Sequence, residues 1–204
     1  EQQRVALARA LAPSPNLLML DEPLGALDRT LRAQLTQELR AVLHQSQIPA
    51  IYVTHDREEA FGLADRLLIL HDGVILQQGS PQELFDHPQT PWIAEFLGLG
   101  NLVAGEADQM EPQIVQTEFA RVVVSTRQTA LTPGQACQLL LRPEDALIGE
   151  PSLNQVNTFE GVVRDSLFMG EYFQLALLCG KTTLHARSQA PAEIGATIRM
   201  SWPA

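Results

Sequence analysis

Apolar residues near the start of the chain recur with helical spacing and then gather into a short run. Within residues 1–12, one face of a helix is formed by Val5, Ala8 and either Leu11 or Ala12, and prolines at positions 13 and 15 are expected to end this helix. The run Leu17–Leu20 is apolar on both faces, as in a strand buried inside a parallel sheet. The pattern therefore predicts a helix followed by a buried strand.

Leucines recur every four residues in the next segment and predict one long helix. Asp28 is a good N-cap for this helix, and one apolar stripe is formed by Leu27, Leu31, Leu35, Leu39 and Leu43. The further elements expected in this half are a strand over 48–53, a helix over 57–64, a buried strand over 67–70, its hairpin partner over 74–76, and a helix that begins at Pro81. Strands that alternate with helices predict a parallel sheet with right-handed crossovers.

Helical stripes disappear near residue 100, and short alternating stretches take their place. Strands are expected over 120–125, 136–141, 158–165, 172–178 and 182–186. The turn residues expected to separate them are Pro133-Gly134, Gly149, Gly161, Gly170, Gly180 and Gly195. Many short strands with regular turns predict a small barrel or sandwich. We therefore expect two domains, an α/β domain over residues 1–99 and a β-rich domain over residues 100–204.

The charge balance excludes several classes of partner. The 204 residues include 14 Lys and Arg against 24 Asp and Glu, a formal net charge of -10. This balance argues against nucleic-acid binding and against electrostatic attachment to an anionic membrane. No apolar stretch approaches the roughly 20 residues that span a bilayer. Cys137 and Cys179 lie in apolar stretches and are expected to be reduced core thiols of a cytosolic protein.

Polar residues with catalytic potential follow two of the predicted strands. Asp21 and Glu22 come directly after the first strand, and ligands of open parallel sheets bind beyond the carboxyl ends of the strands. One carboxylate there can hold Mg²⁺ while the other orients and deprotonates an attacking water. His55 ends the next strand at the same edge and can hydrogen-bond a phosphate oxygen. The alternative for both sites is structural, a solvated acid pair and a lone histidine that cap turns.

Four motifs in one order connect these residues with a known family. They are Glu1-Gln-Gln-Arg4, Leu17-Leu-Met-Leu-Asp-Glu22, Leu24-Gly-Ala-Leu-Asp28 and Thr54-His-Asp56. Together they resemble the second half of an ABC transporter ATPase subunit. In that resemblance they match, in turn, the end of the signature motif, the Walker B strand with its catalytic carboxylate, the D-loop and the switch histidine.

The resemblance implies a role for each motif residue in ATP hydrolysis. Asp21 would support the Mg²⁺ ion, and Glu22 would act as general base on the attacking water. His55 would contact the γ-phosphate of ATP. Asp28 would help to couple two ATP sites across a head-to-tail dimer.

The first motif lies at a helix N-terminus and implies nucleotide binding. Glu1 and Gln2 would face the ATP bound by a partner subunit, since the helix dipole favours phosphate at this end. The alternative for Glu1 is simple compensation of the dipole in the first turn. The family's phosphate-binding loop, glutamine loop and Leu-Ser-Gly-Gly would precede this motif. We therefore expect a fragment cut inside a domain, which alone neither binds ATP tightly nor hydrolyses it.

The region after these motifs resembles one group within the family. Residues 72–88 resemble importer-type subunits, and segments 140–145 and 159–164 resemble the TOBE domain that follows the ATPase core in this group. The implied fold is a partial P-loop NTPase domain of α/β class with a parallel sheet, followed by a small all-β OB-like domain. The Gly-Lys at 180–181 is expected to be a β-hairpin turn, because the glycine that a phosphate-binding loop needs five residues earlier is Leu175.

The implied function of the full-length parent is ATP hydrolysis that drives solute uptake by an ABC importer. ATP and Mg²⁺ are the implied cofactors. The implied partners are a second ATPase subunit in a homodimer or pseudo-dimer, transmembrane permease subunits and an extracytoplasmic solute-binding protein, without nucleic acid. The subunit would lie peripherally on the cytoplasmic face of the cell membrane. The cargo stays open among iron(III), sulfate, polyamines, thiamine and sugars.

Two other functions are kept as alternatives. A chromosome or DNA-repair ABC protein would carry long coiled coils and basic patches, and neither occurs in the sequence. A non-catalytic ligand-sensing module, acting through the β domain, is the alternative from a different class of protein.

Overall fold

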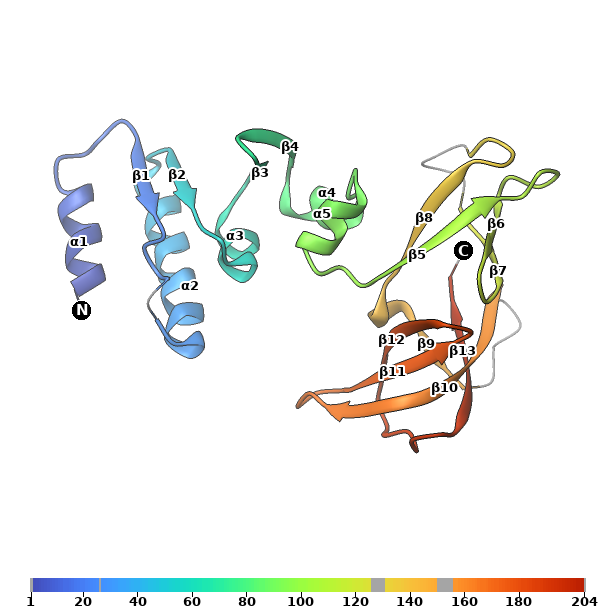
Figure 1. The fold of residues 1–204 in the computed structure, drawn as a ribbon. Coiled ribbons are helices and arrows are strands. Elements are labelled where there is room, and N and C mark those ends of the chain that lie inside the picture. The colour runs from blue at the N-terminus through green and yellow to red at the C-terminus, as the bar shows by residue number, and fades with distance from the viewer. Residues whose placement is uncertain (1, 26, 126–130, 150–155, 204) are drawn as a thin grey trace. The chain divides into compact units, whose positions relative to one another are not determined.

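The computed structural model describes residues 2–25, 27–125, 131–149 and 156–203 (Figure 1). The chain divides into two compact units, residues 1–89 and 90–204. This division falls before the boundary predicted at 99/100, because helix α5, Pro91–Phe96, contacts strand β5, Asn101–Ala107. The domain boundary itself stays a prediction.

The first unit alternates helices and strands, as the sequence predicts. Its elements are α1 Gln2–Leu11, β1 Leu18–Asp21, α2 Arg29–Ser46, β2 Ala50–Val53, α3 Arg57–Leu63, β3 Leu67–His71, β4 Val74–Gly79 and α4 Pro81–Asp86. Strands β1 and β2 pair in parallel, and β3 and β4 form an antiparallel hairpin. The parallel sheet is therefore confirmed for β1 and β2, whereas β3 pairs only with β4 among the described residues.

The apolar strands of the first unit are buried on one face only, which corrects the prediction that both faces are buried. Leu18 is 4% exposed, but its neighbour Met19 is 71% exposed. In β3, Ile69 is buried and Leu70 is exposed. Successive side chains of a strand point to opposite faces, and the described residues of this unit cover only one of them.

Helix α2 begins with a side-chain cap and packs on α3. Asp28 Oδ1 accepts a hydrogen bond from the Leu31 amide at 3.0 Å, as expected for an N-cap. The leucine stripe is only partly buried, since Leu39 is buried and Leu31 is exposed. Polar contacts join α2 to α3 as well, among them one from Arg40 Nη1 to the Gly62 carbonyl at 2.6 Å.

The second unit is built around two antiparallel sheets. Its elements after α5 and β5 are β6 Ile114–Thr117, β7 Arg121–Val123, β8 Ala136–Leu141, the 3-10 helix η1 Pro143–Asp145, β9 Leu147–Ile148, β10 Asn157–Phe168, β11 Phe173–Cys179, β12 Thr182–Ser188 and β13 Thr197–Trp202. The sheets have the orders β7-β6-β5-β8 and β12-β11-β10-β13-β9. The expected β-rich domain of short strands is confirmed, although β5, β6, β9 and β13 lie outside the stretches predicted as strands.

Both sheets of this unit contribute to one hydrophobic core. Leu177, Leu184 and Met200 have no exposed surface, and Phe159 stacks on Trp202 with ring centroids 5.3 Å apart. Full burial of a large apolar side chain contributes about 1.5–3 kcal/mol relative to exposure. The second unit therefore has a core of its own.

Gly161 is a core residue and not a turn residue, which corrects its assignment from sequence. It lies inside β10, opposite Ile198 on β13. A Cβ atom at this position would lie 2.6 Å from Met200 Cε and 2.9 Å from Cys179 Sγ, so glycine is needed for close packing. Gly180, in contrast, confirms the expected hairpin turn, since it connects β11 to β12 at φ 62°.

The two cysteines differ in burial. Both are free thiols; Cys179 is buried in the core as expected, and Cys137 is only half-buried, which corrects the prediction for that residue. Among the described residues, none of the helices combines the length and the apolarity that crossing a bilayer requires.

Candidate functional site

The ends of strands β1 and β2 bring the predicted catalytic residues to one place. Asp21 is the last residue of β1 and pairs with Val53, the last residue of β2. The Glu22 amide then donates to the Val53 carbonyl at 2.9 Å. Glu22 adopts φ 43°, a left-handed conformation that is uncommon for residues other than glycine and that occurs often at functional sites. Both chain segments therefore leave the strands at the same edge.

Glu22 and His55 contact each other directly. His55 Nδ1 lies 2.8 Å from Glu22 Oε1, and the two side chains are 73% and 51% exposed. The hydrogen bond to Glu22 and the charge of that carboxylate raise the pKa of His55, against the cost of desolvation and with further contributions from Asp56 and Glu59. His55 therefore carries positive charge over a wider pH range than a free histidine.

Asp21 lies next to this pair at an exposed strand end. Within the part of the chain that the structure describes, no group of three or more His, Cys, Asp or Glu gathers that could hold a metal ion by itself. Mg²⁺ in nucleotide sites is usually held by one or two carboxylates together with phosphate oxygens and water. An exposed carboxylate beside Glu22 fits this donor set, so Asp21 suits a magnesium site that a nucleotide completes.

The other predicted site residues lie apart from this pair or outside the described residues. Asp28 uses one carboxylate oxygen as the N-cap of α2. Gln2 is the first residue of α1, and its side chain and the whole of Glu1 lie outside what the structure describes. The nucleotide-binding roles of these three residues stay predictions.

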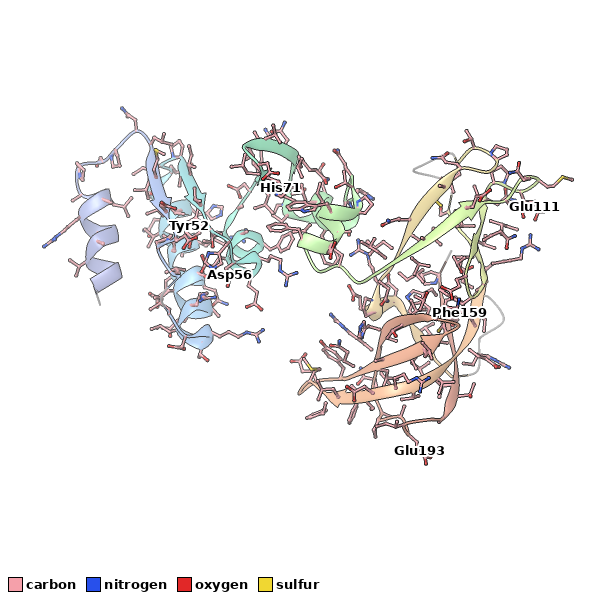
Figure 2. All side chains as sticks on the ribbon, viewed as in Figure 1. Tyr52, Asp56, His71, Glu111, Phe159 and Glu193 are labelled. Carbon is pink, nitrogen blue, oxygen red and sulfur yellow. The ribbon has the colours of Figure 1, made fainter. Side chains whose placement is uncertain are left out.

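A polar network at the start of α3 was missed by the sequence analysis. Glu59 is 1% exposed, and its Oε2 accepts hydrogen bonds from the Tyr52 hydroxyl at 2.6 Å and from Thr54 Oγ1 at 2.9 Å. Arg32 Nε lies 3.4 Å from Glu59 Oε1, and Arg32 Nη1 donates to Asp56 Oδ2. Figure 2 labels Tyr52 and Asp56, which lie close together in the first unit.

Burial and charge set the protonation of this network. Burial, the hydrogen bond to Glu59 and the charge of that carboxylate raise the pKa of Tyr52 well above its usual range, so its hydroxyl stays protonated and donates. Burial opposes ionisation of Asp56, but hydrogen bonds from the Glu59 and Glu58 amides and the nearby Arg32 guanidinium outweigh it and lower the pKa of Asp56.

The sequence contains one motif that involves residues of this network, but that motif predicts a different position for the Glu59 side chain. Asp56 and Glu59 have the spacing of a helix capping box, in which the glutamate turns back to the N-cap amide. The Asp56 part of this pattern is present, since Oδ1 accepts from the Glu58 and Glu59 amides at 2.8 and 3.2 Å. Glu59 instead turns inward to the end of β2.

Comparison with known proteins identifies the family to which the chain belongs. A model of the TOBE domain matches residues 139–204. This domain in the second unit agrees with the TOBE domain expected from the sequence. The chain belongs with the ATP-binding subunits of ABC transporters, in the importer group that has a C-terminal TOBE domain.

Several relatives similar to this chain are described as spermidine/putrescine import ATP-binding protein PotA. The protein from Borrelia garinii subsp. bavariensis is 33% identical over 196 residues, which are 96% of this chain and 54% of the relative. Those from Acetivibrio thermocellus and Trichodesmium erythraeum are 36% and 38% identical, cover 87% and 88% of this chain, and are themselves covered to 49% and 50%. The chain therefore spans about half the length of the curated relatives it matches.

A solved structure is similar to part of the chain. It is the dimeric, post-hydrolysis state of the ATP-binding cassette MJ0796, which is bound to ADP and Pi. The match has 34% sequence identity and a TM-score of 0.35, and it covers 39% of this chain and 34% of the other.

Proposed function

We propose that the chain supplies the catalytic carboxylate and the switch histidine of the ATP-hydrolysing subunit of an ABC importer. The observation that supports this most is the 2.8 Å contact between His55 Nδ1 and Glu22 Oε1 at the ends of two parallel strands. A carboxylate and an imidazole at this edge are placed where open α/β sheets bind their ligands. The activity is proposed for the full-length parent of this chain.

In the proposed mechanism, each residue of the site has one task. Bound Mg²⁺-ATP supplies the scissile phosphoryl group and the charge neutralisation around it. Asp21 holds the magnesium ion. Glu22 orients the attacking water and accepts its proton as general base. His55, whose raised pKa favours the charged imidazolium, contacts the γ-phosphate.

The proposed cargo rests on the descriptions of the relatives, and the proposed partners rest on the family resemblance of the sequence. The matched relatives are described as spermidine/putrescine import proteins, so we propose a polyamine as the cargo. The subunit would form a dimer, with Asp28 coupling two ATP sites and Glu1 and Gln2 facing the partner's nucleotide. It would bind permease subunits at the cytoplasmic face of the membrane, and an extracytoplasmic receptor would deliver the solute.

A chimera tests this function. Residues 1–204 are joined to the N-terminal half of one of the matched relatives, and Mg²⁺-dependent ATP hydrolysis and spermidine uptake are measured. We expect an active chimera in which Glu22→Gln lowers the hydrolysis rate by about 10² or more, the usual contribution of a general base. Glu193→Gln, a carboxylate in an exposed loop of the second unit, is the matched control and leaves the rate unchanged (Figure 2). Unchanged hydrolysis in the Glu22→Gln chimera would contradict the proposal.

The chain alone is proposed to be inactive, because it contains no phosphate-binding loop. The measurement is ATP turnover by the purified 204-residue chain with Mg²⁺. Turnover that Glu22→Gln abolishes would refute this part of the proposal.

A cavity in the second unit favours the ligand-sensing function as a second candidate. It has a volume of about 390 Å³, and its lining includes Val122, Leu139, Arg142, Asp145 and Trp202. The lining is of mixed polarity, and it offers the guanidinium of Arg142 to a small anion beside the carboxylate of Asp145. The test is calorimetric titration of the whole chain with molybdate and sulfate; no heat and no thermal stabilisation would remove this candidate.

A further inference from the structure

The residues on both sides of His55 are anchored, while His55 itself is exposed. Thr54 Oγ1 donates to Glu59 Oε2 at 2.9 Å and accepts from the Asp56 amide at 3.0 Å. Asp56 caps α3 through Oδ1 and receives Arg32 Nη1 at Oδ2. The backbone that carries the imidazole is therefore held by contacts of its two neighbours, in addition to the imidazole's own contact with Glu22.

A single guanidinium group connects this loop to the segment that follows the acid pair. Arg32 Nη2 donates to the Leu27 carbonyl at 3.1 Å, in the segment between Glu22 and α2. The same side chain donates to Asp56 and lies 3.4 Å from Glu59. One side chain of α2 thus contacts the chain segments on both sides of the Glu22–His55 contact, although it touches neither residue.

The environment makes this connection stronger than a surface ion pair. The side chains of Arg32 and Asp56 are 24% and 20% exposed, and that of Glu59 is 1% exposed. Charges at this depth are screened less by solvent than exposed pairs, and a buried carboxylate that loses its cation is strongly unfavourable. Arg32 donates hydrogen bonds to two acceptors and lies within ion-pair distance of a third, in the rigid planar fork that a flexible lysine ammonium does not present.

We propose that Arg32 is a positioning residue that holds His55 against Glu22 by fixing the two chain segments that meet there. Its importance for ATP hydrolysis rests on the proposed function, whereas the contact that it maintains can be measured in the chain itself. Removing the guanidinium would separate Leu27 from Asp56 and leave Glu59 without its cation. The loop around His55 would then move away from Glu22.

The test is the titration of His55, followed by NMR in the full 204-residue chain and assigned with His55→Gln. In Arg32→Met we expect the pKa of His55 to fall to the value found in Glu22→Gln, because both variants lose the Glu22 contact. The direction in which the pKa of His55 changes separates this outcome from a simple charge effect. Removing a cation while the loop stays in place would leave Asp56 and Glu59 less compensated, and the pKa of His55 would stay or rise.

Arg40→Met is the matched control, since Arg40 also joins α2 to α3, through its hydrogen bond to the Gly62 carbonyl. It should leave the pKa of His55 raised even if it lowers the melting temperature as much as Arg32→Met does. If Arg32→Met does not fold, the test uses Arg32→Lys instead. In that variant we expect a His55 pKa between those of the wild type and Glu22→Gln. A His55 pKa that stays raised in the folded Arg32 variant overturns the inference. Because no ATP is used, an inactive chimera would contradict the proposed function and leave this result standing.

Discussion

The two units of the molecule bury their apolar residues to very different degrees. In the second unit, Leu175, Leu177 and Leu184 are completely buried in one core that both sheets share. In the first unit, Met19 and Ile51 are neighbours on paired strands, and both are about half exposed or more. The second unit has a core shared by two sheets, whereas the described residues of the first unit leave one face of its parallel strands uncovered.

This difference predicts unequal resistance to local opening. Segments with few buried apolar contacts open with lower free energy than those in a packed core. In the first unit, the contact between α2 and α3 includes polar groups such as Arg32 and Glu59. We therefore expect the first unit to exchange its amide hydrogens faster than the second.

The largest effect is expected from truncation in the core of the second unit. Leu177→Ala should lower the free energy of unfolding of this unit by about 2–5 kcal/mol, the usual cost of removing a buried leucine. Met19→Ala, at an exposed position of the first unit, should change stability by no more than about 0.5 kcal/mol. Denaturant unfolding followed by circular dichroism measures both. Similar losses in the two variants would contradict the contrast between the units.

A smaller effect is expected at the N-terminus of α2. Asp28→Ala should destabilise the first unit by about 1 kcal/mol, because the Leu31 amide loses its acceptor, and Asp28→Ser should restore most of this loss. Thermal unfolding of the chain measures how much the N-cap contributes to stability. The ATPase chimera then separates two roles: full hydrolysis with Asp28→Ser would limit this residue to capping, and a loss would support its proposed role between ATP sites.

The smallest effect on stability is expected at the exposed Glu22–His55 contact. The pKa of His55 is raised above its usual 6.5, so the stabilisation from this contact is present below pH 6.5 and is lost as the pH rises through the folded-state pKa. Glu22→Gln should lower the pKa of His55 in an NMR titration and barely change the denaturation midpoint. A His55 pKa that is the same in both proteins would show that the contact does not form in solution.

Sequence patterns predicted the elements best where hydrophobic period and local chemistry agree. The stretch 136–141 coincides with β8 residue for residue, and Asp28 caps α2 as expected. Strand β5 was missed because Gly105 and Glu106 interrupt its alternation. Gly105 is needed there for a tertiary reason: a Cβ atom would lie 2.4 Å from Val115 Cγ1 on β6. No local pattern contains that constraint.

The candidate site shows the same difference between features that local patterns predict and features that depend on tertiary packing. Glu22 and His55 could be predicted because strand ends and motif order place them on one edge of a sheet. Arg32 and Glu59 could not, because charged residues on helices are usually solvated. Only the packing of α2 and α3 on the end of β2 reveals that Glu59 is buried.

Cys179 packs against Gly161 in the core of the second unit, so its thiol can be used as a probe of unfolding. Cys179 is 1% exposed, and burial raises the pKa of its thiol to about 11, whereas Cys137 is only half-buried. A maleimide dye should therefore label Cys137 first in the folded chain, because the thiolate is the reactive form. The chain has only these two cysteines. Labelling of Cys179 should follow later as a second increase in mass, and its rate measures how fast the core of the second unit opens. The first unit contains no cysteine and is not labelled.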